Sequence, residues 1–110
     1  MDIDFDEFAR QYEAELTAAV SKMSPRWGVK SYKSHGTMDG VAYAFRLTDN
    51  GSSVAHVEDA GVGGGPNIYW DERDSSASQA FDEEAKRLFP NAGALAGESM
   101  VEAVLQRAGK

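Results

Sequence analysis

Hydrophobic residues recur every three or four positions over residues 4–23, and this spacing predicts an amphipathic N-terminal helix. Asp4 followed by Glu7 fits a capping box, and negative charge here favours the positive end of the helix dipole. Pro25 predicts the end of the helix, because the residue before a proline avoids helical geometry. The apolar stripe consists of Phe5, Phe8, Tyr12, Leu16, Ala19, Val20 and Met23.

The pattern changes to strict alternation in the middle of the chain. Residues 41–48, VAYAFRLT, alternate large apolar side chains with small or polar ones, which predicts a half-buried strand. Asn50-Gly51 follows and is the strongest short signal for a hairpin turn, so residues 53–59 are expected to return as the partner strand. Shorter strands are predicted at 27–34 and 67–71. Together these segments indicate an antiparallel β-meander of three or four strands.

The register of the central hairpin has two possible solutions. With a two-residue turn at Asn50-Gly51, Phe45 faces His56, and His56 and Glu58 lie on the face with the large aromatic rings. With a three-residue loop, Phe45 faces Ala55, and His56 and Glu58 move to the face with small and polar residues. A slip of one residue exchanges the two faces of a strand. Turn chemistry favours the first register and core composition favours the second, so both stay open.

Two further helices are predicted after the strands. Residues 75–89 carry an apolar stripe, and Ser76 with Gln79 fits a capping box at the start. Residues 91–97 form a linker of small residues, and Ser99 with Glu102 fits a capping box that opens a last helix. The predicted class is therefore α+β, with an N-terminal helix, an antiparallel meander and two C-terminal helices packed on one sheet face.

Composition limits the classes of protein that remain. The 110 residues are the size of one domain, so we expect a single α+β domain over residues 1–110. The absence of cysteine excludes disulfides, thiol nucleophiles and thiolate metal sites, and it makes the cytoplasm the expected compartment. No apolar run reaches the ~18 residues of a membrane span, and the acidic N-terminus is unlike a secretory signal.

The charge balance bears on the kind of partner. The formal net charge is -7, with 11 Lys and Arg against 18 Asp and Glu. Direct binding of nucleic acid is disfavoured, because it normally requires a basic face. An acidic surface instead suits a basic protein partner, or it simply keeps the protein soluble as a monomer or weak homodimer.

The glycine-rich segment EDAGVGGGPN, residues 58–67, is the most unusual stretch of the chain. Glycines allow successive backbone N–H groups to converge on an anion, as phosphate-binding loops do. Here strands are predicted on both sides, no helix or lysine follows, and Glu58 and Asp59 would repel a phosphate. A structural turn is therefore favoured over a nucleotide site, with recognition of a partner or small ligand by the loop backbone as the functional alternative.

A second group of polar residues, His56, Glu58 and Asp59, could bind a divalent ion or act in acid–base chemistry. A single histidine lacks the further ligands that zinc expects, and carboxylates at strand ends are usually solvated. No serine lies in a G-x-S-x-G sequence. We therefore expect a protein that is not an enzyme and that needs neither a metal nor a cofactor.

The resulting hypothesis is a small acidic binding protein, of an accessory or inhibitor type found in mobile elements or anti-defence systems. Its expected partner is a basic, nucleic-acid-handling protein. The alternative is a module that binds a small ligand or anion with the Gly61–Asn67 loop, His56 and Glu58. The candidate binding residues are His56, Glu58, Asp59, Gly61, Gly63, Gly64, Gly65, Asn67, Tyr69 and Trp70.

Overall fold

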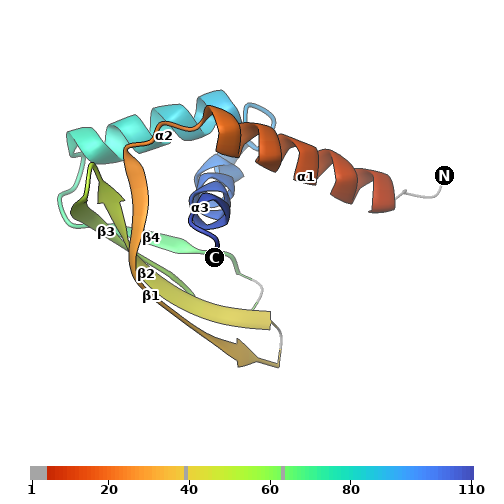
Figure 1. The fold of residues 1–110 in the computed structure, drawn as a ribbon, viewed down its shortest axis with the longest axis horizontal. Helices are drawn as coiled ribbons and strands as arrows, with labels where there is room; N and C mark the ends of the chain where they lie inside the picture. The colour runs from red at the N-terminus through yellow and green to blue at the C-terminus, as the bar shows by residue number, and fades with distance from the viewer. Residues whose placement is uncertain (1–4, 39, 63) are drawn as a thin grey trace.

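The computed structural model describes residues 5–38, 40–62 and 64–110, and for residues 5–9 it describes the backbone alone (Figure 1). The elements in chain order are α1 (Phe5–Lys22), β1 (Trp27–Thr37), β2 (Gly40–Asp49), β3 (Ser52–Asp59), β4 (Asn67–Trp70), α2 (Ser76–Leu88), the 3-10 turn η1 (Gly93–Leu95) and α3 (Ala96–Arg107). The strands form one antiparallel sheet in the order β1-β2-β3-β4, and the helices lie on one side of it (Figure 1). The predicted α+β class is confirmed.

The predicted helix starts differ from the structure at both C-terminal helices. The cap of α2 is Ser75 rather than Ser76: the Ser75 side chain accepts a hydrogen bond from the Ser78 backbone N–H at 3.1 Å. The last helix begins at Ala96, directly after η1, so the prediction that Ser99 opens it is wrong. Ser99 lies inside α3 with 7% of its surface exposed. The N-terminal capping residue Asp4 lies outside the described residues.

The turn between β2 and β3 follows the predicted chemistry. Asp49 pairs with Ser52, so Asn50-Gly51 forms a two-residue turn, and both turn residues have positive φ angles, 51° and 88°. Positive φ at both central positions is the requirement that favours Asn-Gly in hairpins. Directly after the turn the register shifts, because Val54 is an extra residue on β3. This β-bulge was not predicted.

The bulge changes the cross-strand pairs from either predicted set. Phe45 pairs with Val57, and Arg46 pairs with His56. The Val57 side chain is thereby fully buried, while His56 and Glu58 lie on the opposite face of the sheet. One inserted residue therefore satisfies both the two-residue turn and the demand for an apolar core, since a single-residue shift exchanges the two faces.

Helix α3 supplies most of the helical side of the core and runs across the sheet between its two edges. Its N-terminal end lies near β4, because Glu98 is the neighbour of Gly65 just before that strand. Its C-terminal end lies near β1, where the Lys110 ammonium lies 5.4 Å from the centre of the Tyr32 ring. The buried residues of this helix are Ala96, Ser99, Met100, Val101, Ala103, Val104 and Leu105. This path places the N-terminal turn of α3 beside the edge strand β4.

Polar contacts fix the connection between α1 and β1. The Arg107 guanidinium at the end of α3 donates to the carbonyl oxygens of Met23, Ser24 and Trp27, which satisfies backbone groups at the C-terminal end of α1. Arg26 binds Asp49 through two bonds, Nε–Oδ1 at 2.8 Å and Nη2–Oδ2 at 2.6 Å. The hydrogen bonds from Arg26 lower the pKa of Asp49 below its usual value.

Candidate functional site

The face of the sheet that the helices leave uncovered carries several predicted site residues. His56, Glu58, Asn67 and Tyr69 lie on this open face, where His56 pairs with Tyr69 and Glu58 with Asn67. The His56 and Tyr69 rings stack with centroids 6.3 Å apart, and His56 Nε2 lies 3.2 Å from Glu58 Oε2. The side chains of His56 and Glu58 are 40% and 50% exposed. The pair is therefore a solvated contact on an open surface.

The glycine-rich loop has a close structural contact at its start. The Gly61 carbonyl accepts a hydrogen bond from Thr37 Oγ1 at 2.8 Å, and the Gly61 N–H donates to Asp59 Oδ1 at 2.8 Å. A Cβ atom at Gly61 would lie 2.8 Å from the Ala42 backbone nitrogen, and its φ of 75° is in the left-handed region. Gly61 is therefore required by a close approach of two backbones, and its N–H is occupied by a carboxylate.

Gly64 and Gly65 of the same loop differ in how closely other atoms approach them. A Cβ at Gly65, with φ of 78°, would lie 2.8 Å from Glu98 Oε2, whereas a Cβ at Gly64 would meet no atom within 4 Å. Gly63 lies outside the described residues. Because Asp59 and Glu98 border the loop, carboxylates lie where an anion would bind, and the contacts of Gly61 and Gly65 account for the glycines structurally.

Trp70 lies on the other side of β4 from Tyr69, facing the helices. Its ring packs edge-on against Phe81 of α2, with centroids 5.5 Å apart. The Trp27 ring makes a similar edge-on contact with Phe81, with centroids 5.1 Å apart. Tyr69 is 52% exposed, so of the two adjacent aromatics one anchors the strand and the other faces solvent.

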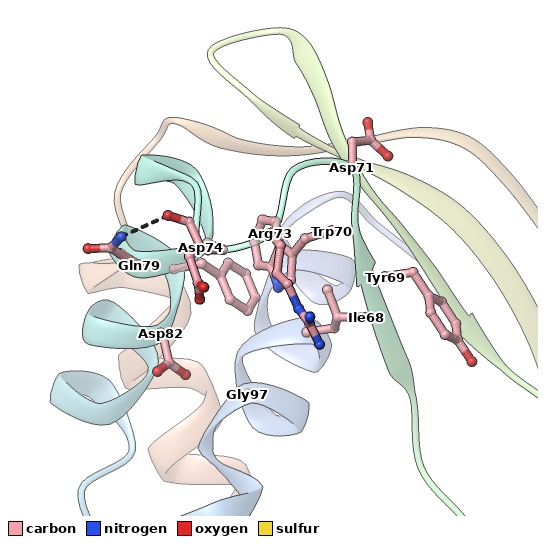
Figure 2. Close-up of a pocket in the computed structure, with 11 residues that line it drawn as sticks. Ile68, Tyr69, Trp70, Asp71, Arg73, Asp74, Gln79, Asp82 and Gly97 are labelled. Carbon is pink, nitrogen blue, oxygen red and sulfur yellow. Dashed lines mark hydrogen bonds between the residues drawn. The ribbon is translucent and has the colours of Figure 1, made fainter.

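A cleft of about 720 Å³ lies between β4 and the beginnings of α2 and α3. Figure 2 shows the residues of β4 on one side of it, Gln79 and Asp82 of α2 on the other, and Gly97 of α3 at its base. The apolar part of the lining comes from Ile68, Trp70 and Phe81, and the polar part from Asp71, Arg73, Asp74, Ser78, Gln79 and Asp82. The cleft thus combines an aromatic and aliphatic floor with a polar rim.

The backbone of β4 adds a second feature to this cleft. Asp71 N donates to Val54 O at 3.0 Å, so residues 67, 69 and 71 of this segment direct their backbone groups toward β3. In an antiparallel ladder this orientation alternates, and the N–H and C=O groups of Ile68 and Trp70 therefore point away from the sheet. No described strand pairs with this side of β4. Unpaired backbone groups and the cleft consequently lie side by side.

No protein family, curated protein or solved structure matches this chain.

Within the part of the chain that the structure describes, no three His, Asp or Glu side chains are grouped as a metal site would require. No helix of that part is long and apolar enough to cross a membrane.

Two other hollows are less suited to binding an extended chain. One, of about 440 Å³, lies on the open face beside Lys33, His35, Glu58 and Asn67. Another, of about 650 Å³, lies between α1 and the segment joining α2 to α3, beside the exposed Leu95. The second is lined by residues of α1, by the connection from Phe89 to Leu95 and by Ser99 of α3, with no strand residue among them. The first reaches both edge strands, through Lys33 and His35 of β1 and Asn67 of β4, but its lining does not include Ile68 or Trp70, whose backbone groups are unpaired.

The sequence alone did not reveal the cleft as a site. The sequence predicts Tyr69 and Trp70 as binding candidates, whereas Gln79 is predicted as a capping residue and Gly97 as part of a linker. Arg73, Asp74 and Asp82 are part of no predicted site. These residues come together only because α2 and the N-terminal turn of α3 pack beside β4. The polar run that follows the aromatic strand, residues 71–74, was the available signal, since loop residues positioned by a rigid scaffold often carry binding functions.

Proposed function

We propose that this chain is a non-enzymatic binding protein that holds an extended segment of a partner protein along the free edge of β4. The observation that carries the proposal is the outward-facing backbone of Ile68 and Trp70 directly beside the cleft. A peptide that adds a strand to a sheet edge gains affinity from main-chain hydrogen bonds and specificity from pockets that receive alternate side chains. β4 supplies the edge, and the cleft supplies such a pocket.

The two edges of the sheet differ in a way that supports this choice. The β1 edge strand carries Lys30 and Lys33 and an irregularity between them, where Ser31 has a φ of 57°. Lysines and bulges on an edge strand protect it against pairing with another chain. The four residues of β4 contain neither a bulge nor a charged side chain. Of the two edges, β4 is therefore the better template for a partner strand.

Charge supports a basic partner of the kind the composition favours. The net charge of -7 would attract a protein with a positive surface, such as one that handles nucleic acid, and would accelerate its association at low salt. Within this proposal the protein acts as an accessory or inhibitor, because a bound segment is held without any chemical step. The His56–Glu58 pair lies on the opposite face from the cleft and takes no part.

Filling the cleft provides the test. Gly97 lines it, and a Cβ there would meet no atom within 4 Å, so Gly97→Leu places a side chain in open space. Peptides selected from a displayed random library on the wild-type protein are expected to bind this variant about 10- to 100-fold more weakly, the equivalent of excluding one apolar side chain. The same variant is expected to be more stable by about 0.5–1 kcal/mol, because glycine is replaced within a helix.

Gln106→Leu is the matched control, since it adds the same side chain to an exposed position about 13 Å further along α3. Affinities are measured by isothermal titration and stabilities by urea denaturation. The proposal is supported if Gln106→Leu keeps the wild-type affinity while Gly97→Leu loses affinity and is more stable than the wild type. Equal binding by all three proteins, or no enrichment of peptides at all, would contradict it.

A further inference from the structure

The charges that line the cleft are unevenly balanced. Three carboxylates contribute to its lining, those of Asp71, Asp74 and Asp82, against the single cation Arg73. Asp71 is ion-paired with Arg46, and Asp82 lies 3.3 Å from Lys86 in an exposed pair on one helix. An exposed helical pair of this kind contributes little to stability, so Asp82 can change partners readily. The residues that line the cleft therefore have a net negative charge.

Arg73 already occupies part of this space. Its side chain extends from the connection between β4 and α2 into the region between Ile68 on one side and the acidic residues of the α2 side on the other (Figure 2). Among the described residues it forms no ion pair. A long cationic side chain can lie with its aliphatic stem on apolar surface while its head stays in water. Arg73 therefore indicates which shape and chemistry this cleft accommodates.

We propose that the cleft receives an arginine or lysine side chain from the partner's extended segment, and that this side chain displaces Arg73. Its stem lies over Ile68 and Trp70, where the indole ring favours a cation, and its charged head lies near Asp74 and Asp82. This inference rests on the proposed function, because it assumes that a segment pairs with β4. It adds the chemical class of the residue that determines specificity at that site.

Complementarity of charge and the movable Arg73 both support a basic side chain. Displacing Arg73 into solvent costs little, because it has no described ion pair to break, and the incoming cation can occupy the space that it leaves beside Asp74 and Asp82. Hydrogen bonds in which one partner is charged are stronger than those between neutral groups. An acidic side chain in the same place would be repelled by the like charges of Asp74 and Asp82, so a segment with an acidic residue at this position would bind more weakly.

The experiment compares the charge of the selected peptides and of the cleft. Library peptides that bind the wild-type protein but not Gly97→Leu are synthesised with capped ends. Each is made in two versions, one with its Arg or Lys and one in which citrulline replaces the Arg or norleucine replaces the Lys. The neutral peptides are expected to bind the wild-type protein about tenfold more weakly. The double variant Asp74→Asn, Asp82→Asn is expected to lose the same factor for the basic peptides only. Asn at position 74 suits the local φ of 54°.

Two further variants separate this result from a general charge effect. Glu13→Gln with Glu83→Gln changes the net charge equally at exposed positions outside the cleft lining, and the affinity of the basic peptide should stay at the wild-type value. Arg73→Ala should raise the affinity of the basic peptide a few-fold, because it removes the competing cation. This corresponds to about 0.5–1 kcal/mol of binding free energy. Weaker binding by Arg73→Ala would overturn the inference, because it would assign Arg73 to a carboxylate of the partner.

The outcomes distinguish this inference from the proposed function. Peptides that depend on the Gly97 position but contain no Arg or Lys, or a double Asn variant that behaves like the Gln control, would overturn the inference alone. Peptides that bind Gly97→Leu as well as they bind the wild type would overturn both. Basic peptides that lose affinity in the double Asn variant and gain it in Arg73→Ala support both.

Discussion

Gly61→Ala is expected to lower the free energy of unfolding by about 2–4 kcal/mol, the sum of a strained backbone and a steric overlap. The residue has a φ of 75°, and its new Cβ would lie 2.8 Å from Ala42 N and 2.9 Å from Val41 C. Both neighbours are backbone atoms of β2, so a rotamer change cannot relieve the contact. Either the loop leaves the sheet and loses its hydrogen bond to Thr37, or the end of the β1–β2 hairpin moves. Urea denaturation followed by circular dichroism measures the loss.

Gly64→Ala is the control in the same loop. Its Cβ would meet no atom within 4 Å, and its φ lies outside the positive range. The alanine should therefore be neutral or stabilising by up to about 1 kcal/mol, because it reduces the freedom of the unfolded chain. Equal effects at Gly61 and Gly64 would contradict the account of the loop as a backbone contact with β2. The comparison also tests whether the glycines serve structure rather than a ligand.

Phe81→Ala is expected to cost about 3–5 kcal/mol of stability, the range for removing a buried aromatic ring. Phe81 is 2% exposed and packs edge-on against both Trp27 and Trp70, with centroid distances of 5.1 and 5.5 Å. Its ring therefore joins the beginning of β1, the edge strand β4 and helix α2. Loss of that ring leaves a cavity beside both indoles, and a destabilisation of this size is a large part of the stability of a small domain.

Phe81→Leu serves as the comparison for this prediction. Leucine retains an apolar side chain, so a loss of about 1–2 kcal/mol is expected, well below that of alanine. Both variants are measured by urea denaturation with near-ultraviolet circular dichroism, which reports on the packing of the tryptophans. A Phe81→Ala protein that is less than 1 kcal/mol below the wild type would mean that α2 and β4 are not held together through this ring.

The fold class could be predicted because local patterns and tertiary packing agree over most of the chain. The stripe from Leu16 to Met23 repeats at helical spacing, and residues 41–48 alternate as a half-buried strand does. The structure contains a helix and a strand at these places. The Asn50-Gly51 turn was also predictable, because few other dipeptides accept two positive φ angles.

The bulge at Val54 could not be predicted from either pattern alone. The turn fixes one register and the core requires another, and an inserted residue reconciles them only where the sheet can bend locally. The helix starts were missed for a related reason. Ser75 and Ser76 are both suitable caps, and Ser99 fits the capping pattern although packing buries it inside α3. Packing decides between residues that are equally suitable by local preference.

The candidate site was only partly accessible from the sequence. The glycine loop attracted attention by its composition, yet Gly61 and Gly65 are explained by close contacts with β2 and Glu98. The cleft lies on the other side of β4, at Trp70, where residues from three elements meet. All lining residues except Gly97 lie within residues 68–82, but they form no known motif, and only the packing of α2 and α3 beside β4 brings them around one cleft.

Amide hydrogen exchange of β4, measured by NMR with and without a selected peptide, shows whether a partner segment pairs with this edge strand. In the free protein we expect rapid exchange at Ile68 and Trp70 and slow exchange at Tyr69 and Asp71, because of these four residues only the latter two direct their amides toward β3. On binding, Ile68 and Trp70 should become protected by about tenfold or more. A bound peptide that leaves these two amides unprotected, or that protects only residues of the open face, would contradict the proposed strand addition at β4.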